Sequence, residues 1–306
     1  MDRRARDEFL MSTLICFGFG YCAEHFAAAF GQKFDRIVGT VRGKERAAVL
    51  NAYDAGRLHA LVFDGTHATP ELESAVAAAN YLLVSAPPGA NGDPVLAACG
   101  AALAEAKQLR SVVYLSTIGV YGDRGGAWVD EATPPKPDST RSRERLAAER
   151  TWQDFGARYG VPAAVLRLAG IYGPGQNALV QIARGSARRI VKAGQIFNRI
   201  HVGDIAQAID AAFARPASGI FNIADDEPSP PGDPIIFAAQ LMGVDPPHEI
   251  SVEDAAATMS PMALSFWQEC RRVRNNKLKR ELGVTLRYPT YREGLRELWE
   301  EEQSAT

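Results

Sequence analysis

The sequence predicts an α/β protein built on a doubly wound parallel sheet, and two observations support this prediction. The first is the opening of the chain, where the apolar run of residues 13–17 breaks into Gly18-Phe19-Gly20 and continues as an alanine-rich helical stretch. The second is that short apolar runs then alternate with helical stretches along most of the chain. Strands that alternate with helices form parallel sheets whose faces the helices cover.

The elements follow one another in a regular order. Strands are expected at residues 13–17, 36–42, 59–63, 81–85, 111–117, 163–168 and 219–224. Helices are expected near residues 21–30, 44–55, 70–79, 94–109, 140–156 and 204–213. Residues 122–139 are rich in glycine, proline and charge, as in ordered loops that border active sites. Turns are expected at 169–175, a helix and then an extended segment at 177–196, and mostly helix after residue 231.

Composition limits the classes of partner. A chain of 306 residues with 46% hydrophobic residues can bury a large core and an added lobe. Its formal net charge is −2 with both signs spread along the chain, so neither nucleic acid nor a membrane is expected as a partner. The four cysteines have no metal-ligand spacing, so no metal site is predicted. Residues 1–12 form a charged tail without the apolar core of a signal peptide, and a cytoplasmic protein is expected.

The glycine turn predicts a dinucleotide-binding site. Gly18 permits a tight turn, and Gly20 lets the backbone approach a pyrophosphate. The helix that begins near Tyr21 and Cys22 directs its N–H groups and the positive end of its dipole at the phosphates. The alternative, two glycines in an ordinary surface turn, is disfavoured by the flanking strand and helix.

The end of the second strand favours NADP(H), while NAD(H) stays open. About 20 residues past the glycines, where a carboxylate would bind the ribose 2′-hydroxyl, the chain has Thr40 and Arg42, followed by Lys44 and Arg46. A guanidinium can bind a 2′-phosphate through paired charge-assisted hydrogen bonds. The alternative is that these basic residues form only the solvated start of a helix.

Several segments in order resemble the extended short-chain dehydrogenase/reductase superfamily, which contains NAD(P)-dependent epimerases and dehydratases. They are the glycine turn and residues 116–122 (STIGVYG), 146–149 (LAAE), 167–175 (RLAGIYGPG) and 199–206 (RIHVGDIA). The resemblance covers nearly the whole chain. It implies a Rossmann domain with a seven-stranded sheet, assigned to residues 13–171 and completed by 200–225. A smaller, mostly helical C-terminal substrate lobe is assigned to residues 172–199 and 226–306.

The chain departs from this superfamily at its catalytic pair. The superfamily's helix carries Tyr-x-x-x-Lys, in which the tyrosine exchanges a proton with the substrate oxygen. Counted back from Leu146, these positions hold Arg141 and Arg145. Arginine stays protonated in proteins, so it can be a fixed donor but is a poor proton shuttle. The sequence is therefore interpreted as an atypical member in which Arg145 could keep the lysine's contact with the nicotinamide ribose; the alternative pairs Arg145 with Glu149 on an exposed helix face.

Other side chains are candidates for the chemistry. The resemblance implies a hydroxyl that meets the reacting substrate oxygen, and Ser116 or Thr117 matches it at the carboxyl end of a strand. Tyr121, five residues past Ser116, is the first candidate for a replacement acid, and Tyr172 is the second. Each tyrosine could instead be a packing residue, and the Ser-Thr pair could merely end its strand.

The resemblance also implies further contacts. Asp64 matches the position that contacts adenine, and Ser85, Ala86 and Pro87 match the wall of the cofactor channel. The substrate-binding candidates are Tyr172, Arg199 and His201. An arginine at this position could bind a phosphate or carboxylate, whereas His201 could equally be structural.

One further residue is assigned a structural role. Asp204 precedes an apolar helical stretch, and we expect it to cap that helix.

Two functions stay open at this point. One is an NAD(P)-dependent oxidoreductase or epimerase-like enzyme that acts on a small polar substrate, such as a nucleotide-sugar. The other is a protein that binds NADP(H) without turnover, as a sensor or scaffold, which the missing Tyr-x-x-x-Lys pair suggests. A homodimer is expected by analogy alone.

Overall fold

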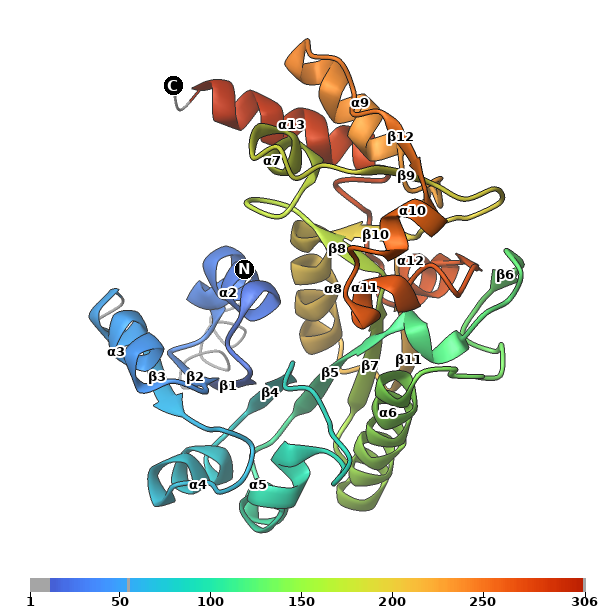
Figure 1. Ribbon diagram of the computed structural model, residues 1–306. Helices are drawn as coiled ribbons and strands as arrows, with labels where there is room; N and C mark the ends of the chain where they lie inside the picture. Colours follow the sequence, from blue (N-terminus) through green and yellow to red (C-terminus); the bar gives the residue numbers. More distant parts are fainter. Residues whose placement is uncertain (1–11, 54–55, 305–306) are drawn as a thin grey trace. The chain divides into compact units, whose positions relative to one another are not determined.

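Seven parallel strands form the central sheet of the computed structural model, in the order β11-β7-β5-β4-β1-β2-β3 (Figure 1). The structure describes residues 12–53 and 56–304, so the predicted charged tail lies outside the described residues except for Ser12. The strands are β1 (Thr13–Phe17), β2 (Arg36–Val41), β3 (Leu58–Val62), β4 (Tyr81–Val84), β5 (Ser111–Thr117), β7 (Ala163–Leu168) and β11 (Gly219–Ile223). The strand order reverses between β1 and β4, and doubly wound sheets bind ligands at the carboxyl ends of the strands at such a point.

Six helices belong to the crossovers of this sheet. They are α2 (Tyr21–Phe30), α3 (Lys44–Tyr53), α4 (Pro70–Ala77), α5 (Pro94–Glu105), α6 (Thr140–Tyr159) and α8 (Val202–Ala214). Two 3₁₀ turns, η1 (Gly31–Lys33) and η2 (Ile118–Tyr121), follow α2 and β5. Prolines begin α4 and α5, because proline fits the first helical position. The side chains of Thr69 and Asp93 cap these two helices by accepting hydrogen bonds from their first N–H groups.

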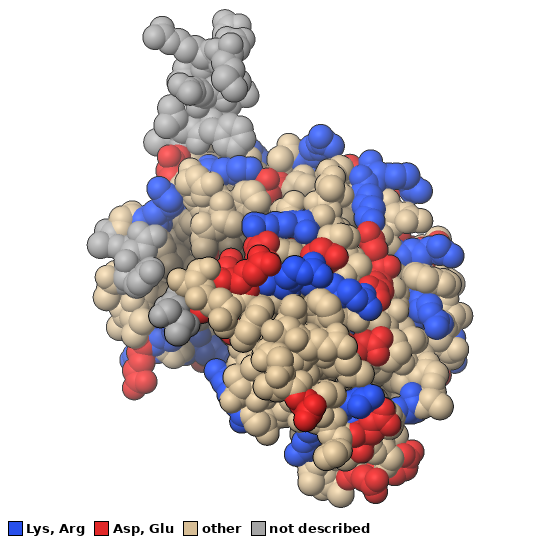
Figure 2. Space-filling view, turned by 90° about the horizontal axis from the view of Figure 1, so that it is seen from above, with Lys and Arg blue, Asp and Glu red and all other residues tan. Residues whose placement is uncertain are grey.

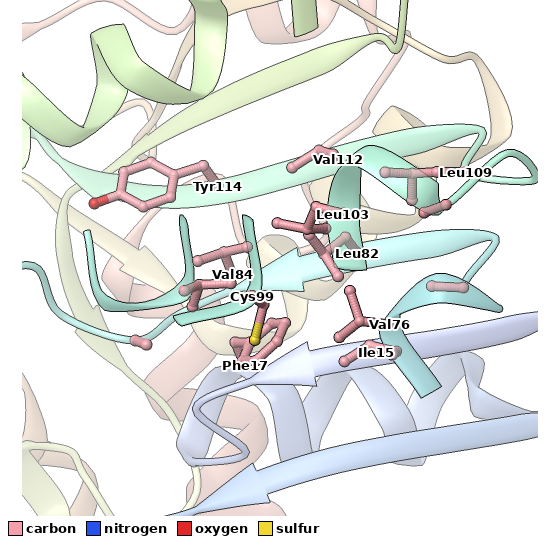
Figure 3. Packing of buried hydrophobic residues seen from close by; sticks show 14 of the residues in the cluster. Ile15, Phe17, Val76, Leu82, Val84, Cys99, Leu103, Leu109, Val112 and Tyr114 are labelled. Carbon is pink, nitrogen blue, oxygen red and sulfur yellow. The ribbon is translucent and has the colours of Figure 1, made fainter. Parts of the chain in front are cut away.

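Apolar side chains cover both faces of the sheet. On the face of α4, α5 and α6, a large buried cluster includes Phe17, Leu82, Cys99 and Val112 (Figure 3). The other face holds an aromatic cluster in which the rings of Tyr81 and Phe213 meet edge to face at 5.2 Å. Burial on both faces explains why the strands appear in the sequence as continuous apolar runs.

Shorter elements make up much of the remaining chain. The strands are β6 (Trp128–Val129), β8 (Gly170–Tyr172), β9 (Arg189–Val191), β10 (Arg199–His201), β12 (Glu249–Ser251) and β13 (Arg272–Val273), and they form the parallel pairs β10/β8, β12/β9 and β13/β6. The helices are α7 (Ala178–Ala183), α9 (Asp233–Met242), α10 (Val252–Ala256), α11 (Pro261–Ser265), α12 (Asn276–Glu281) and α13 (Tyr291–Ser304). Helices α7, α9 and α13 share one apolar core, which contains Leu179, Ala238 and Leu295.

The predicted fold class is confirmed, and the predicted strands of the main sheet differ from the observed ones only at their ends. The stretch 169–175, expected to be all turn, contains the short strand β8. The chain divides into a first unit (residues through 117, 143–167 and 206–221) and a second unit (118–142, 168–205 and 222–306). This division differs from the predicted boundaries mainly because residues 118–142 belong to the second unit.

The described surface carries mixed charge. Figure 2 shows Lys and Arg side chains interspersed with Asp and Glu on the visible face. Within residues 12–53 and 56–304, no helix has the length and apolar character needed to cross a membrane. The same residues contain no group of three or more His, Cys, Asp or Glu side chains that could hold a metal ion.

Candidate functional site

The turn between β1 and α2 is fixed by Gly18. This residue has φ +83°, which favours glycine, and a Cβ atom here would lie 2.9 Å from the backbone nitrogen of Ala86. The N–H of Gly18 donates to Thr40 Oγ1 at 3.0 Å, and the N–H of Phe19 donates to the Thr40 carbonyl at 2.7 Å. The turn is therefore fastened to the end of β2 and lies against the segment after β4.

Gly20 has a different role. Its backbone is extended (φ −125°, ψ −160°), and a Cβ atom added here would meet no atom within 4 Å. Helix α2 begins at the next residue and has no side-chain cap at its N-terminus. An uncapped helix N-terminus with open space beside it suits an anion, because the first N–H groups and the helix dipole both favour negative charge. These residues thus fit the pyrophosphate of a dinucleotide.

The end of β2 presents one free guanidinium. The Thr40 side chain is buried and holds Gly18, whereas Arg42 is exposed and makes no hydrogen bond or ion pair with the described residues. Arg46 is already paired, since its Nη2 lies 2.5 Å from Glu24 Oε1 in the first turn of α2. Among the basic side chains considered for a 2′-phosphate, Arg42 and the exposed Lys44 are therefore unpaired within the described residues, and only Arg42 offers a guanidinium for paired hydrogen bonds.

The two segments after β3 and β4 are ordered by local bonds. Asp64 is exposed, and its carboxylate accepts hydrogen bonds from the N–H and hydroxyl of Thr66, which lower the pKa of Asp64. The N–H groups of Ser85 and Ala86 both donate to the Phe17 carbonyl at the end of β1. Pro87, which follows them, is exposed. The segment after β4, which is predicted to line the cofactor channel, is thus held against the carboxyl end of β1.

A buried polar network lies at the carboxyl end of β5. Ser116 Oγ donates to Glu149 Oε1 on α6 at 2.5 Å, and the same carboxylate pairs with Arg167 on β7 at 2.7 Å. The side chains of Glu149 and Arg167 are each 1% exposed. Because the Ser116 proton is bound by a buried carboxylate, the neighbouring Thr117, which is half-buried, is the better candidate to meet a substrate oxygen.

Arg145 also lies on α6, but its guanidinium binds other partners than the Glu149 carboxylate does. Its Nη1 donates to the Leu115 carbonyl at 2.8 Å and to the Tyr114 hydroxyl at 3.1 Å. Burial raises the pKa of Tyr114 to about 12, and Figure 3 shows this hydroxyl directed away from the apolar cluster. The alternative pairing of Arg145 with Glu149 is wrong, because the Glu149 carboxylate is bound to Arg167 and Ser116.

Tyr121 is fully buried in the second unit. Its hydroxyl donates to Asn222 Oδ1 at 2.7 Å. This environment agrees with the packing alternative and argues against Tyr121 as the replacement acid, because a buried and bonded hydroxyl cannot approach a substrate without rearrangement.

A hollow of about 200 Å³ lies in the second unit. Two of the predicted substrate-binding residues, Tyr172 and Arg199, line it together with Gln176, Asn177, Gln181, Pro231, Tyr291 and five other residues. Arg199 is half-buried and donates to Ser229 Oγ at 2.8 Å, while the Tyr172 hydroxyl donates to the Thr290 carbonyl at 3.3 Å. Burial raises the pKa of Tyr172 above its ordinary value, which makes it a poor acid at neutral pH.

His201 and Asp204 have structural partners. His201 does not line the hollow; it is buried between the rings of Tyr172 and Tyr288, and its Nδ1 accepts from the Gly203 N–H at 3.1 Å. Asp204 does not cap α8, which begins two residues earlier. Its carboxylate accepts instead from the N–H groups of Arg287 and Tyr288. The capping prediction is therefore wrong, because a long-range contact uses this carboxylate.

Asp225 is a residue that the sequence did not single out. It is 1% exposed, and its Oδ2 has no hydrogen-bond partner among the described residues. Burial raises the pKa of Asp225 from 3.8 to about 8, although the nearby charge of Arg199 opposes this. The residues on either side of Asp225 in the sequence do not indicate that its carboxyl is buried, because the burial arises from tertiary packing.

Asp225→Asn is expected to raise stability at pH 8 and to change it little at pH 4. Between the unfolded value of 3.8 and the folded value of about 8, the folded state holds a proton that the unfolded state has released. Stability from this group is thus fully present below pH 3.8 and is lost as the pH rises through about 8. The expected gain in the free energy of unfolding of Asp225→Asn over the unmodified protein at pH 8 is on the order of a few kcal/mol. Thermal unfolding of both proteins across this range tests it.

The control for this measurement is Asp64→Asn. Asp64 is exposed and its pKa is lowered, so its loss should give no gain at pH 8. Identical pH dependence in Asp225→Asn and the unmodified protein would contradict the prediction.

The doubly wound sheet and the turn between β1 and α2 are typical of nucleotide-binding α/β proteins. Comparison with known protein families points to the same class. The model of the NAD dependent epimerase/dehydratase family matches residues 92–224. This match supports the resemblance of the chain to the extended short-chain dehydrogenase/reductase superfamily.

Individual relatives refine this placement. A solved structure from Silicibacter pomeroyi DSS, described as a functionally unknown conserved protein, is 44% identical over 95% of this chain and 99% of that chain, with a TM-score of 0.83. The protein YeeZ of Escherichia coli K12 is 29% identical over 47% of this chain, and the match spans about half (50%) of its length. A dTDP-glucose 4,6-dehydratase from Bacillus anthracis in complex with NAD shares the fold, at 17% identity over 96% of this chain and 97% of that chain and a TM-score of 0.71.

Proposed function

We propose that this protein is an NAD(P)-dependent oxidoreductase or epimerase-like enzyme that acts on a small polar substrate. The observation that supports it most is the open space at Gly20 beside the uncapped N-terminus of α2. The match of residues 92–224 to this family and the NAD-bound dehydratase of the same fold support a nicotinamide dinucleotide as the ligand of the turn between β1 and α2. When bound, this cofactor would supply a hydride donor or acceptor.

The side chains of this unit would orient the reactants. Arg145 would contact the nicotinamide ribose from α6, since the Leu115 carbonyl and Tyr114 hydroxyl fix its guanidinium. Thr117 would hydrogen-bond the reacting substrate oxygen at the end of β5. Neither of the arginines at the Tyr-x-x-x-Lys positions can exchange a proton near neutral pH. When a substrate alcohol is oxidised, its hydroxyl proton would therefore pass to water through the Thr117 hydroxyl, and reduction would take up a proton by the same path.

The absent proton shuttle favours a second candidate function, a non-catalytic NADP(H)-binding protein. The two are separated by incubating the protein with NADPH and a panel of sugar nucleotides, ketones and aldehydes. Consumption of NADPH with one of them supports the enzyme. Tight binding without turnover across the panel supports the sensor or scaffold. No calorimetric heat with either dinucleotide at concentrations up to about 1 mM would exclude both.

Cofactor choice is proposed to rest on Arg42, with NADP(H) preferred. Arg42→Ala should weaken NADPH binding by about tenfold or more, because charge-assisted bonds to the 2′-phosphate are lost. NADH lacks this phosphate, so its affinity should change by less than about threefold. Isothermal titration calorimetry with both dinucleotides measures the difference.

Arg158→Ala is the matched control, since it removes an exposed positive charge from the far end of α6. Equal losses for NADPH and NADH in Arg42→Ala would remove the reason for preferring NADP(H).

A further inference from the structure

Two hollows of the second unit adjoin each other. One, of about 200 Å³, contains Arg199 and is called the Arg199 hollow. The other, the Arg184 hollow of about 340 Å³, is lined by Arg184 at the C-cap of α7 and by Ser186. The residues that line both hollows are Ile171, Gln176, Asn177 and Gln181. Because the hollows share these residues, one ligand can occupy both.

The charge that lines the two hollows has a single sign. Among the described residues, Arg199 and Arg184 are the only charged side chains that line either hollow, and no carboxylate lines them. The Arg184 side chain is exposed and makes no ion pair or hydrogen bond with the described part of the chain. A ligand that fills both hollows therefore meets two positive charges and no negative one.

Arg199 is a half-buried cation without a counter-charge. Its Nη1 donates to Ser229 Oγ at 2.8 Å and to the Phe197 carbonyl at 3.3 Å, and both acceptors are neutral. Burial lowers the pKa of Arg199, and burial raises the pKa of Asp225 to about 8, so the Asp225 carboxyl is protonated at neutral pH. Burying a charge without a partner costs free energy. An anion bound in the Arg199 hollow would supply the missing counter-charge.

The wall common to the two hollows is rich in amide groups. Gln176 and Gln181 are exposed, and their side-chain amides make no hydrogen bond with other described residues. An amide both donates and accepts hydrogen bonds, as a hydroxyl does. This wall therefore suits the part of a ligand that carries hydroxyl groups.

We propose that the two hollows form one binding site for a hydroxylated ligand with an anionic group at each end. Arg199 binds one anionic group and Arg184 binds the other, while Gln176 and Gln181 bond the hydroxyl groups between them. Sugar diacids and sugar bisphosphates have this chemistry, because a guanidinium binds carboxylate and phosphate alike. The site goes beyond the proposed function, since its residues all belong to the second unit.

The test uses probes of matched length, added to the full-length protein and followed by NMR titration. D-Glucarate has a carboxylate at each end and should bind at least about tenfold more tightly than D-gluconate, which has a carboxylate at one end only. Adipate, a diacid of the same chain length without hydroxyl groups, should bind about threefold to tenfold more weakly than glucarate. Fructose 1,6-bisphosphate and fructose 6-phosphate form the phosphate arm. The arm with the larger preference for two anionic groups identifies the anion.

Variants assign the contacts. Arg184→Gln should remove the preference for two anionic groups, since the Arg184 guanidinium binds the second of them. Gln181→Leu should remove most of the difference between glucarate and adipate. Arg188→Gln is the matched control, because Arg188 is an exposed arginine of the same unit that lines neither hollow.

Four results would overturn the proposal. They are equal binding of the probes with one and two anionic groups in both arms, equal effects of the two arginine variants, two molecules of glucarate per chain, and no binding of any probe at about 10 mM. The titrations contain no dinucleotide. Absence of this site in a protein that binds NADPH would overturn this inference alone, whereas glucarate binding by a protein that does not bind NADPH would defeat only the proposed function.

Discussion

Gly20→Val is expected to abolish dinucleotide binding while leaving the fold intact. The backbone at Gly20 is extended, which valine adopts readily, and a Cβ atom here meets no protein atom within 4 Å. The branched side chain would therefore fill only the space that a pyrophosphate needs. Loss of two or more charge-assisted bonds to the phosphates corresponds to about a hundredfold or more in affinity. Calorimetry with NADPH measures the loss, and thermal unfolding checks the fold.

Two other glycines provide the contrast. Gly18→Val should lower stability as well as binding, because Gly18 has φ +83° and its Cβ would lie 2.9 Å from the Ala86 nitrogen. Gly100→Val should affect neither strongly, since Gly100 lies on α5 with open space around it. Retention of NADPH affinity in Gly20→Val would refute the assignment of this turn.

The parts of the fold that the sequence predicted are those with local causes. The strand at residues 13–17 and the strand at 111–117 have the observed bounds, because strands buried on both faces are unbroken apolar runs. The helix at 21–30 also agrees, since the glycine turn before it sets its start. Ends without such a signal were less accurate: the helix predicted at 94–109 stops at Glu105.

The partners of the candidate side chains could not be predicted in the same way. Local spacing suggested that Glu149 pairs with Arg145, four residues away, but its partners are Ser116 and Arg167, which are 33 and 18 residues away. Tyr121 likewise bonds a residue 101 positions further along the chain. Such pairs form because the sheet brings distant strands together, which no periodicity within one element shows.

Glu149→Gln is expected to be among the most destabilising single substitutions in this chain. It leaves the buried guanidinium of Arg167, 1% exposed, without its counter-charge. Removing one partner of a buried ion pair costs about 3–5 kcal/mol, which is a large part of the 5–15 kcal/mol that stabilises a typical protein. Urea unfolding should show a clearly lower midpoint. The exposed pair Arg46–Glu24 is the control, because Arg46→Ala should cost no more than about 1 kcal/mol.

The two halves of the buried pair should not be equivalent. Arg167→Met leaves a carboxylate that can take up a proton, whereas Glu149→Gln leaves a guanidinium that cannot release one. Arg167→Met should therefore cost less than Glu149→Gln at neutral pH. The double variant Glu149→Leu/Arg167→Met should recover most of the loss, since an apolar pair has no charge to desolvate. Additive losses in the double variant would mean that the two side chains stabilise the protein through separate contacts.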